Sequence, residues 1–150
     1  MTESRPSPER EILLVEDNPG DVRLLREALR EVPYLGRLHA VESVDQALDF
    51  LLRRDSFAAA VRPNVVLLDL NLPRRHGLDL LREMRRIDAI AGIPVIVLTS
   101  SASEEDRRCS YASAATAFLT KPQSLDAYVD LLHVVATWAS EQPRQEHPPS

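Results

Sequence analysis

Five polar residues follow or end short apolar stretches of the sequence, and their types suit phosphoryl chemistry. Glu16 and Asp17 follow the first stretch, and Asp69 lies near the end of a later one. Thr99 ends another stretch, and Lys121 follows the last. A carboxylate can bind a metal ion or attack phosphorus, whereas an ammonium and a hydroxyl can stabilise the charge of a phosphoryl group in transfer. Together these residues could accept a phosphoryl group.

The three acidic residues need a cation if they lie close together. Two carboxylates about 4 Å apart repel by about 4 kcal/mol at an effective dielectric constant of about 20, so such a cluster binds protons or a cation. Oxygen ligands favour Mg²⁺ or Mn²⁺, which keep waters and leave positions open for phosphate oxygens. We expect Glu16 and Asp17 to bind the metal and Asp69, inside its apolar stretch, to be the nucleophile.

Each of these residues also has an ordinary explanation when it is taken alone. Glu16 and Asp17 could be a solvated strand end and a helix cap, and Asp69 could be a similar strand end. Thr99 could be a β-branched strand residue, and Lys121 could belong to an unremarkable loop. Their joint placement at the ends of apolar stretches favours the functional interpretation over five separate coincidences.

Five strands and five helices are expected to position these side chains. The strand candidates are short, apolar and without alternation, as in a parallel sheet covered on both faces. They span residues 11–16, 37–42, 64–70, 93–99 and 117–120. Helical spacing, with start signals such as the capping box at Ser43, predicts helices over 19–32, 44–53, 78–90, 104–113 and 125–139.

The alternation of strands and helices predicts an α/β fold with a doubly wound parallel sheet. In such folds ligands bind at the carboxyl ends of the strands. All five chemical candidates lie at that edge. Residues 1–9 and 141–150 are polar and contain prolines, so we expect flexible tails around one domain over 10–140.

Composition narrows the classes of function. The 18 Lys and Arg residues against 23 Asp and Glu give a net charge of -5, which does not favour nucleic-acid binding. The single cysteine, Cys109, cannot form a disulfide within the chain, and no apolar stretch is long enough for a membrane span. With no apolar segment near the N-terminus to act as a signal peptide, we expect a cytoplasmic protein without membrane contact.

Competing motifs do not fit. The segment that starts at Asp69 begins like a calcium loop, but Arg74 and Leu80 occupy positions that need glycine and glutamate. The four glycines are too scattered for a dinucleotide fingerprint or a phosphate-binding loop, and the histidines lack the spacing of metal ligands.

Four segments together resemble the receiver domain of two-component response regulators. They are LLVEDNPGD, LLDLNLPRRHG, VIVLTSSAS and AFLTKP, and the resemblance extends over residues 11–139. It leaves little of the chain for an output domain, and the first segment is most similar to the stand-alone receivers that accompany bacterial phytochromes. The resemblance implies a flavodoxin-like sheet with strand order 2-1-3-4-5.

The resemblance also implies a role for each matching residue. Asp69 would be the phosphoacceptor, Glu16 and Asp17 would hold the metal, and the backbone carbonyl of Asn71 would join them. Thr99 and Phe118 would be the switch pair, and Lys121 would be the essential cation. The bond before Pro122 would be cis. These roles require the fold to bring the named residues close together.

The sequence departs from the family pattern in three places. His76 stands where relatives often have an acidic residue, and residues 114–116 replace a turn that usually contains glycine. Gln123 after the proline is also unusual. None of these changes removes a reacting group, although they could alter the mobility of loops and a partner surface.

The last helix carries two apolar stripes. One follows the expected core spacing, and the other consists of Ala127, Leu131, Val134 and Trp138, about 120° away. The second stripe could be covered by the C-terminal tail or by a neighbouring helix. We favour a homodimer interface formed by Leu131, Val134 and Trp138, together with the last strand and its flanking helices.

The sequence therefore predicts a phosphoacceptor switch, not an enzyme with a separate substrate. A sensor histidine kinase, with a bacteriophytochrome as a candidate, would phosphorylate Asp69, and the domain would support its own dephosphorylation. One alternative is a Mg²⁺-dependent phosphatase of the haloacid dehalogenase type, but Asn71 replaces the second acid of its D-x-D motif. Another is a receiver-like adaptor that is never phosphorylated, although such proteins usually lack the acceptor or the lysine.

Overall fold

The structure is a computed structural model that describes residues 10–32, 36–100 and 103–141. Its strands are β1 (Arg10–Val15), β2 (Gly36–Val41), β3 (Val65–Asp69), β4 (Val95–Thr99) and β5 (Ala117–Thr120). Its helices are α1 (Pro19–Arg30), α2 (Val44–Leu51), α3 (Gly77–Arg86), α4 (Glu104–Ala112) and α5 (Leu125–Glu141), with a short 3-10 helix η2 (Asp55–Phe57). The predicted strands and helices are thus all present within the described ranges.

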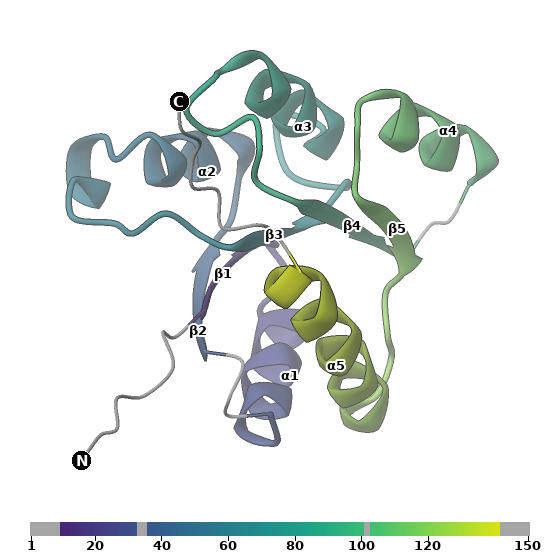
Figure 1. The fold of residues 1–150 in the computed structure, drawn as a ribbon. Helices are drawn as coiled ribbons and strands as arrows, with labels where there is room; N and C mark the ends of the chain where they lie inside the picture. The colour runs from purple at the N-terminus through teal and green to yellow at the C-terminus, as the bar shows by residue number, and fades with distance from the viewer. Residues whose placement is uncertain (1–9, 33–35, 101–102, 142–150) are drawn as a thin grey trace.

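The five strands form one parallel sheet in the order β2-β1-β3-β4-β5. Helices α1 and α5 cover one face of the sheet, and α2, α3 and α4 cover the other, as Figure 1 shows. The doubly wound, flavodoxin-like α/β prediction is therefore confirmed. Because the chain order reverses beside β1, the carboxyl ends of β1 and β3 lie together at the switch point where such folds bind ligands.

The central strands β3 and β4 and the last four residues of β1 are buried on both sides, which explains why their sequences do not alternate. Successive residues of one strand face different core clusters: Leu13 belongs to the cluster under α2 and α3, and Leu14 to the cluster under α1 and α5. Both are almost completely buried. Burial on both faces holds the sheet in one register, since a slip of one residue would move every side chain to the other face.

Side-chain caps begin the helices near the positions that the sequence indicates. Asn18 Oδ1 accepts hydrogen bonds from the backbone N–H groups of Gly20 and Asp21 at the start of α1. At α2, Ser43 Oγ accepts from the N–H of Gln46, and Gln46 Oε1 accepts from the N–H of Glu42. The predicted capping box is therefore formed, with its return bond one residue earlier than the motif usually has it.

Most element boundaries differ from the prediction by only a few residues. The largest difference is α3, which ends at Arg86 because Ile87 adopts an extended conformation. In contrast, α5 continues to Glu141, so that residue belongs to the helix. The other residues of the predicted tails, 1–9 and 142–150, lie outside the described part of the chain.

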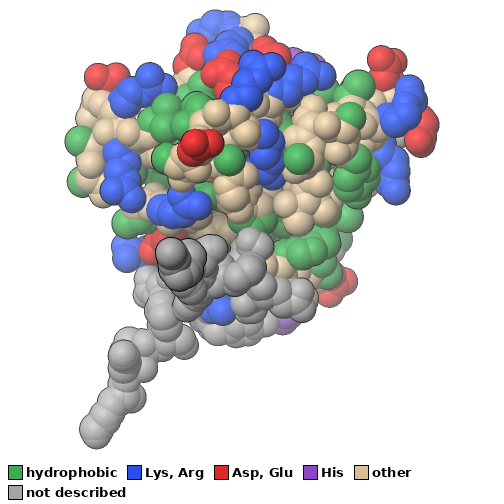
Figure 2. Space-filling model, turned by 45° about the horizontal axis from the view of Figure 1, so that its top comes forward, with side chains coloured by type: hydrophobic (Ala, Val, Ile, Leu, Met, Phe, Trp, Pro, Cys, Tyr) green, Lys and Arg blue, Asp and Glu red, His purple; other side chains and the backbone are tan. Residues whose placement is uncertain are grey.

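The outer surface of α2, α3 and α4 carries basic and acidic side chains interspersed with one another, as Figure 2 shows. Arg75 illustrates this mixing, because it contacts Asp45 of α2 and Asp79 and Glu83 of α3. Among the described residues, no helix is both long and apolar enough to span a membrane.

Candidate functional site: an acidic pocket with one lysine

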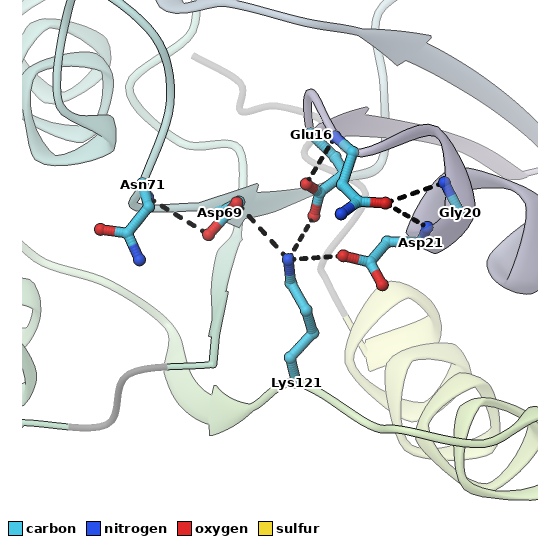
Figure 3. Close-up of polar contacts among 7 residues, drawn as sticks. Glu16, Gly20, Asp21, Asp69, Asn71 and Lys121 are labelled. Carbon is cyan, nitrogen blue, oxygen red and sulfur yellow. Dashed lines mark hydrogen bonds and ion pairs between the residues drawn. The ribbon is translucent and has the colours of Figure 1, made fainter.

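The carboxyl ends of three strands bring the predicted site residues together. Glu16 and Asp17 directly follow β1, Asp69 is the last residue of β3, and Lys121 directly follows β5. Figure 3 shows the side chains of Glu16, Asp69 and Lys121 pointing toward one another. The structure therefore assembles the pocket from segments that are a hundred positions apart.

Glu16, Asp17 and Asp69 form a group that could hold a metal ion. Each offers a carboxylate oxygen, and these oxygens lie within 4.8 Å of one another. Glu16 and Asp69 are buried, with exposed fractions of 3% and 5%, whereas Asp17 is exposed. Two buried oxygen ligands and one open to solvent fit a hard divalent cation that keeps some of its waters.

Lys121 provides the positive charge of this pocket. Its Nζ lies 2.8 Å from Glu16 Oε1, 2.8 Å from Asp21 Oδ2 and 3.5 Å from Asp69 Oδ2. Burial lowers the pKa of the ammonium, but hydrogen bonds to Asp21 and Glu16 and the charges of Glu16 and Asp69 outweigh this effect and raise the pKa above its ordinary value. Lys121 therefore stays protonated and can stabilise negative charge next to Asp69.

Burial acts on the charge of Glu16 as well, because its side chain is almost completely buried. Burial raises the pKa of Glu16 above its ordinary value, although hydrogen bonds from Lys121 and from the backbone N–H of Asn18 work against this rise. The Asn18 N–H donates to Glu16 Oε2 over 3.0 Å. A divalent cation at this site would favour the ionised form of Glu16 further.

Asp69 is held in place from two sides. The backbone N–H of Asn71 donates to Asp69 Oδ1 over 3.2 Å, while Asp69 Oδ2 faces Lys121. Gly77 allows this arrangement, since a Cβ there would lie 2.5 Å from the carbonyl oxygen of Asp69 and 2.8 Å from Cα of Leu70. Any larger residue at position 77 would push against the end of β3 that carries the acceptor.

Thr99 and Phe118 lie beside the pocket on β4 and β5. Thr99 is completely buried, and its carbonyl oxygen accepts a hydrogen bond from the backbone N–H of Lys121 over 3.0 Å. Phe118 is buried in the cluster under α2 and α3, and its backbone N–H donates to the hydroxyl of Tyr111 on α4. The pairing of Thr99 with Phe118 as a switch stays a prediction.

Asp21 is a pocket residue that was not predicted from the sequence. Its carboxylate belongs to the first turn of α1, and it is as close to Lys121 as Glu16 is. The sequence places Asp21 in the first turn of the helix that follows Glu16 and Asp17. It does not show that the Asp21 side chain faces the end of β5.

Two sequence predictions are wrong in this structure. The Lys121–Pro122 bond is trans, because no cis peptide bond occurs among the described residues; trans is the isomer that X-Pro bonds usually favour. Leu131 is not available for a dimer interface, since it packs with α1 and the sheet and is only 8% exposed. Of the same stripe, Val134 is 46% exposed, and Trp138 is partly buried against that cluster.

Two of the departures from the family pattern, at His76 and in residues 114–116, affect a helix cap and a turn. His76 caps α3 by accepting the N–H of Leu78 at Nδ1 over 3.1 Å. Ala114 takes the left-handed conformation, with φ at 69°, where a glycine would fit without strain.

Comparison with known proteins identifies the family. The family description "Response regulator receiver domain" matches residues 12–133, which is most of the chain. The chain belongs to the response regulator receiver family. This receiver has the fold, the acidic pocket and the lysine that the four sequence segments predict, and the match does not favour the phosphatase alternative.

Relatives of this receiver include a cyanobacterial response regulator of similar length. The response regulator Rcp1 of Synechocystis is 37% identical over 119 residues, which is 79% of this chain and 81% of that protein. A crystal structure of the Mn²⁺-bound form of Rcp1 has a TM-score of 0.78 at 31% identity and covers 93% of this chain and 99% of its own.

Two further solved structures have the same fold. The phosphorylated cyanobacterial phytochrome response regulator RcpA has a TM-score of 0.82 at 31% identity and covers 95% of this chain and 100% of its own. The bacteriophytochrome response regulator RtBRR has a TM-score of 0.75 at 33% identity, with 95% and 85% covered. The likeness to these proteins extends over the whole described domain.

Proposed function

We propose that this receiver accepts a phosphoryl group on Asp69 from a sensor histidine kinase and acts as a switch. The observation that carries this proposal is the convergence of Asp69 with Lys121 and with the carboxylates of Glu16 and Asp17. A buried carboxylate that faces an ammonium and a cation-binding group has both parts that phosphoryl acceptance requires.

The transfer would proceed at phosphorus. A carboxylate oxygen of Asp69 forms a bond to phosphorus while the bond between phosphorus and the kinase's histidine nitrogen breaks, and the electron pair leaves with that nitrogen. Lys121 pairs with an oxygen of the phosphoryl group, and the Thr99 hydroxyl donates to another. In the reverse direction of the switch, water attacks phosphorus, the Asp69 oxygen leaves as a carboxylate and phosphate is released.

We propose that Mg²⁺, or Mn²⁺, assists both steps. Glu16, Asp17, Asp69 and the backbone carbonyl of Asn71 would hold the ion, which would neutralise the charge of the phosphoryl oxygens. The donor chemistry supports a hard cation, and the related Rcp1 has a Mn²⁺-bound form. The chain itself keeps the carboxylates of Glu16 and Asp17, the carbonyl of Asn71 and the ammonium of Lys121 around the carboxylate of Asp69.

We infer a phytochrome-type kinase as the partner, because RcpA is described as a phytochrome response regulator and RtBRR as a bacteriophytochrome one. A cytoplasmic location and the absence of nucleic-acid binding stay predictions from the sequence. The homodimer also stays a proposal, now with Val134, Trp138, β5 and its flanking helices and without Leu131.

Phosphorylation by a small donor tests the proposal. Acetyl phosphate with Mg²⁺ should add one phosphoryl group to the protein, detected as one adduct by intact mass measurement. Asp69→Asn should abolish the adduct, and Asp79→Asn, the same change at an acid on the outer side of α3, should leave it unchanged. An adduct that forms equally on Asp69→Asn would contradict the proposal.

A further inference from the structure

Asp21 differs from the other carboxylates of the pocket in one respect. Glu16 and Asp69 each contact Lys121 and also belong to the group that could hold a metal ion. Asp21 contacts Lys121 at 2.8 Å but is not part of that group. The ammonium therefore has one partner that a bound cation would not share.

The position of Asp21 is fixed by the start of α1. Its backbone N–H donates to the side chain of Asn18, which caps the helix, and its carboxylate is 24% exposed next to the better buried Lys121. Figure 3 shows Asp21 on one side of the Lys121 ammonium and Asp69 on the other. The ammonium thus lies between the acceptor and a carboxylate on the helix.

A divalent cation and the Lys121 ammonium would compete for the same oxygens. An ion that takes Glu16 and Asp69 repels the ammonium and withdraws two of its three hydrogen-bond acceptors. Without another acceptor, the long side chain would either leave the pocket or exclude the ion. Either outcome separates two positive groups that phosphoryl acceptance needs at once.

We propose that Asp21 is a positioning residue that retains the Lys121 ammonium beside Asp69 when a divalent cation takes over the carboxylates of Glu16 and Asp69. This role rests on the proposed function, because it assumes that the pocket binds such an ion. Asp21 would not touch the ion or the phosphoryl group. It would act only through Lys121.

Mg²⁺ binding in a double-mutant cycle tests whether Asp21 acts through Lys121. Asp21→Asn should weaken Mg²⁺ binding about fivefold, because the ammonium then pairs only with the ion's own ligands, and in a Lys121→Met background the same change should have an effect below about twofold. Asp21→Glu should restore binding, and Glu27→Gln, the same charge change further along α1, should leave it unchanged. An equal loss in both backgrounds would show a plain charge effect and overturn the proposal.

The lysine content allows a direct measurement of the ammonium. Lys121 is the only lysine in the sequence, so uniformly ¹⁵N-labelled protein gives one lysine ammonium signal in addition to its backbone amide signals. Hydrogen bonding protects such a signal from exchange with water. We expect the wild-type signal to persist after Mg²⁺ is added, and the Asp21→Asn signal to be lost after the same addition.

The two possible failures can be told apart in the same titration. If Mg²⁺ shifts the backbone signals of the pocket but the wild-type ammonium signal is lost, the role of Asp21 is wrong while the metal site stands. If Mg²⁺ changes no backbone signal, the metal site itself is wrong, and the proposed function loses its cofactor together with the role of Asp21.

Discussion

Helices α4 and α5 follow Thr99 and Lys121 on opposite faces of the sheet, and they are anchored in different ways. Over residues 125–138 of α5, whose burial the structure describes, four residues are buried in the cluster with α1 and the sheet: Tyr128, Leu131, Leu132 and Val135. In α4, which is described over its full length, the one buried residue is Ser110. Its hydroxyl has no hydrogen-bond partner in the part of the chain that the structure describes. Apolar burial therefore fixes α5 firmly and α4 weakly.

A polar contact replaces apolar packing at the end of α4. The guanidinium of Arg85, on α3, donates to the carbonyl oxygen of Ala114 in the turn after α4 and to the carbonyls of Ala91 and Ile93. The helix that follows Lys121, α5, is therefore held by apolar packing. The helix that follows Thr99, α4, is held mainly through hydrogen bonds to the turn at its end. The stability of α4 should then respond to polar changes more than to apolar ones.

The largest effect is expected in α5. Leu132 is completely buried, so Leu132→Ala should lower the free energy of unfolding by about 2–5 kcal/mol through lost burial and a cavity. Urea unfolding measures this change. Val61→Ala, at an exposed position outside the proposed dimer interface, should cost less than about 0.5 kcal/mol. A loss for Leu132→Ala no greater than for Val61→Ala would contradict the firmer anchoring of α5.

Arg85 should contribute the next largest effect. Arg85→Met removes the donor for three carbonyl oxygens, so we expect the free energy of unfolding to fall by about 1–3 kcal/mol. Arg82→Met, at an exposed position of the same helix, serves as the control and should be nearly neutral. Hydrogen exchange should show the extra opening in α4 and its turn, and uniform opening of the whole domain would argue against a local contact.

The turn itself should gain stability from glycine. Ala114 has a positive φ, which costs an L-residue roughly 1–2 kcal/mol, and part of this cost is offset by the larger unfolded-state freedom of glycine. Ala114→Gly should therefore raise the free energy of unfolding by about 0.5–1 kcal/mol in thermal or urea unfolding. The same substitution at Ala115, which lacks a positive φ, should lower it.

The smallest effect is expected at Ser110, which is as deeply buried as Leu132. Ser110→Ala removes a hydroxyl that has no hydrogen-bond partner among the described residues, so the free energy of unfolding should stay the same or rise by about 0.5 kcal/mol. Differential unfolding of the two proteins in one buffer resolves this change. A loss above about 1 kcal/mol would mean that the hydroxyl is hydrogen-bonded and α4 is better anchored than described.

Much of the site could be predicted from the sequence because parallel strands that are buried on both faces have recognisable apolar sequences. Once β1, β3 and β5 were located, their carboxyl ends had to bring Glu16, Asp69 and Lys121 to one edge. The start of α2 at Ser43 was predictable for a local reason, since a capping side chain bonds within its own turn.

What could not be predicted depends on contacts between distant elements. The closeness of Asp21 to Lys121 joins the start of α1 to the end of β5, and no local pattern reports it. Leu131 was assigned to a surface because α5 has two apolar stripes, yet α1 and the sheet together bury more of the helix than one stripe. The unpaired hydroxyl of Ser110 likewise depends on how α4 packs, which spacing alone does not show.

The most direct test of the account locates the phosphoryl group on the chain. After reaction with acetyl phosphate and Mg²⁺, borohydride reduces an acyl phosphate of aspartate to homoserine, and peptide mass measurement then identifies the converted position. We expect homoserine at position 69 alone. Conversion at Asp17 or Asp21, or no conversion in a protein that binds Mg²⁺, would contradict Asp69 as the acceptor of this pocket.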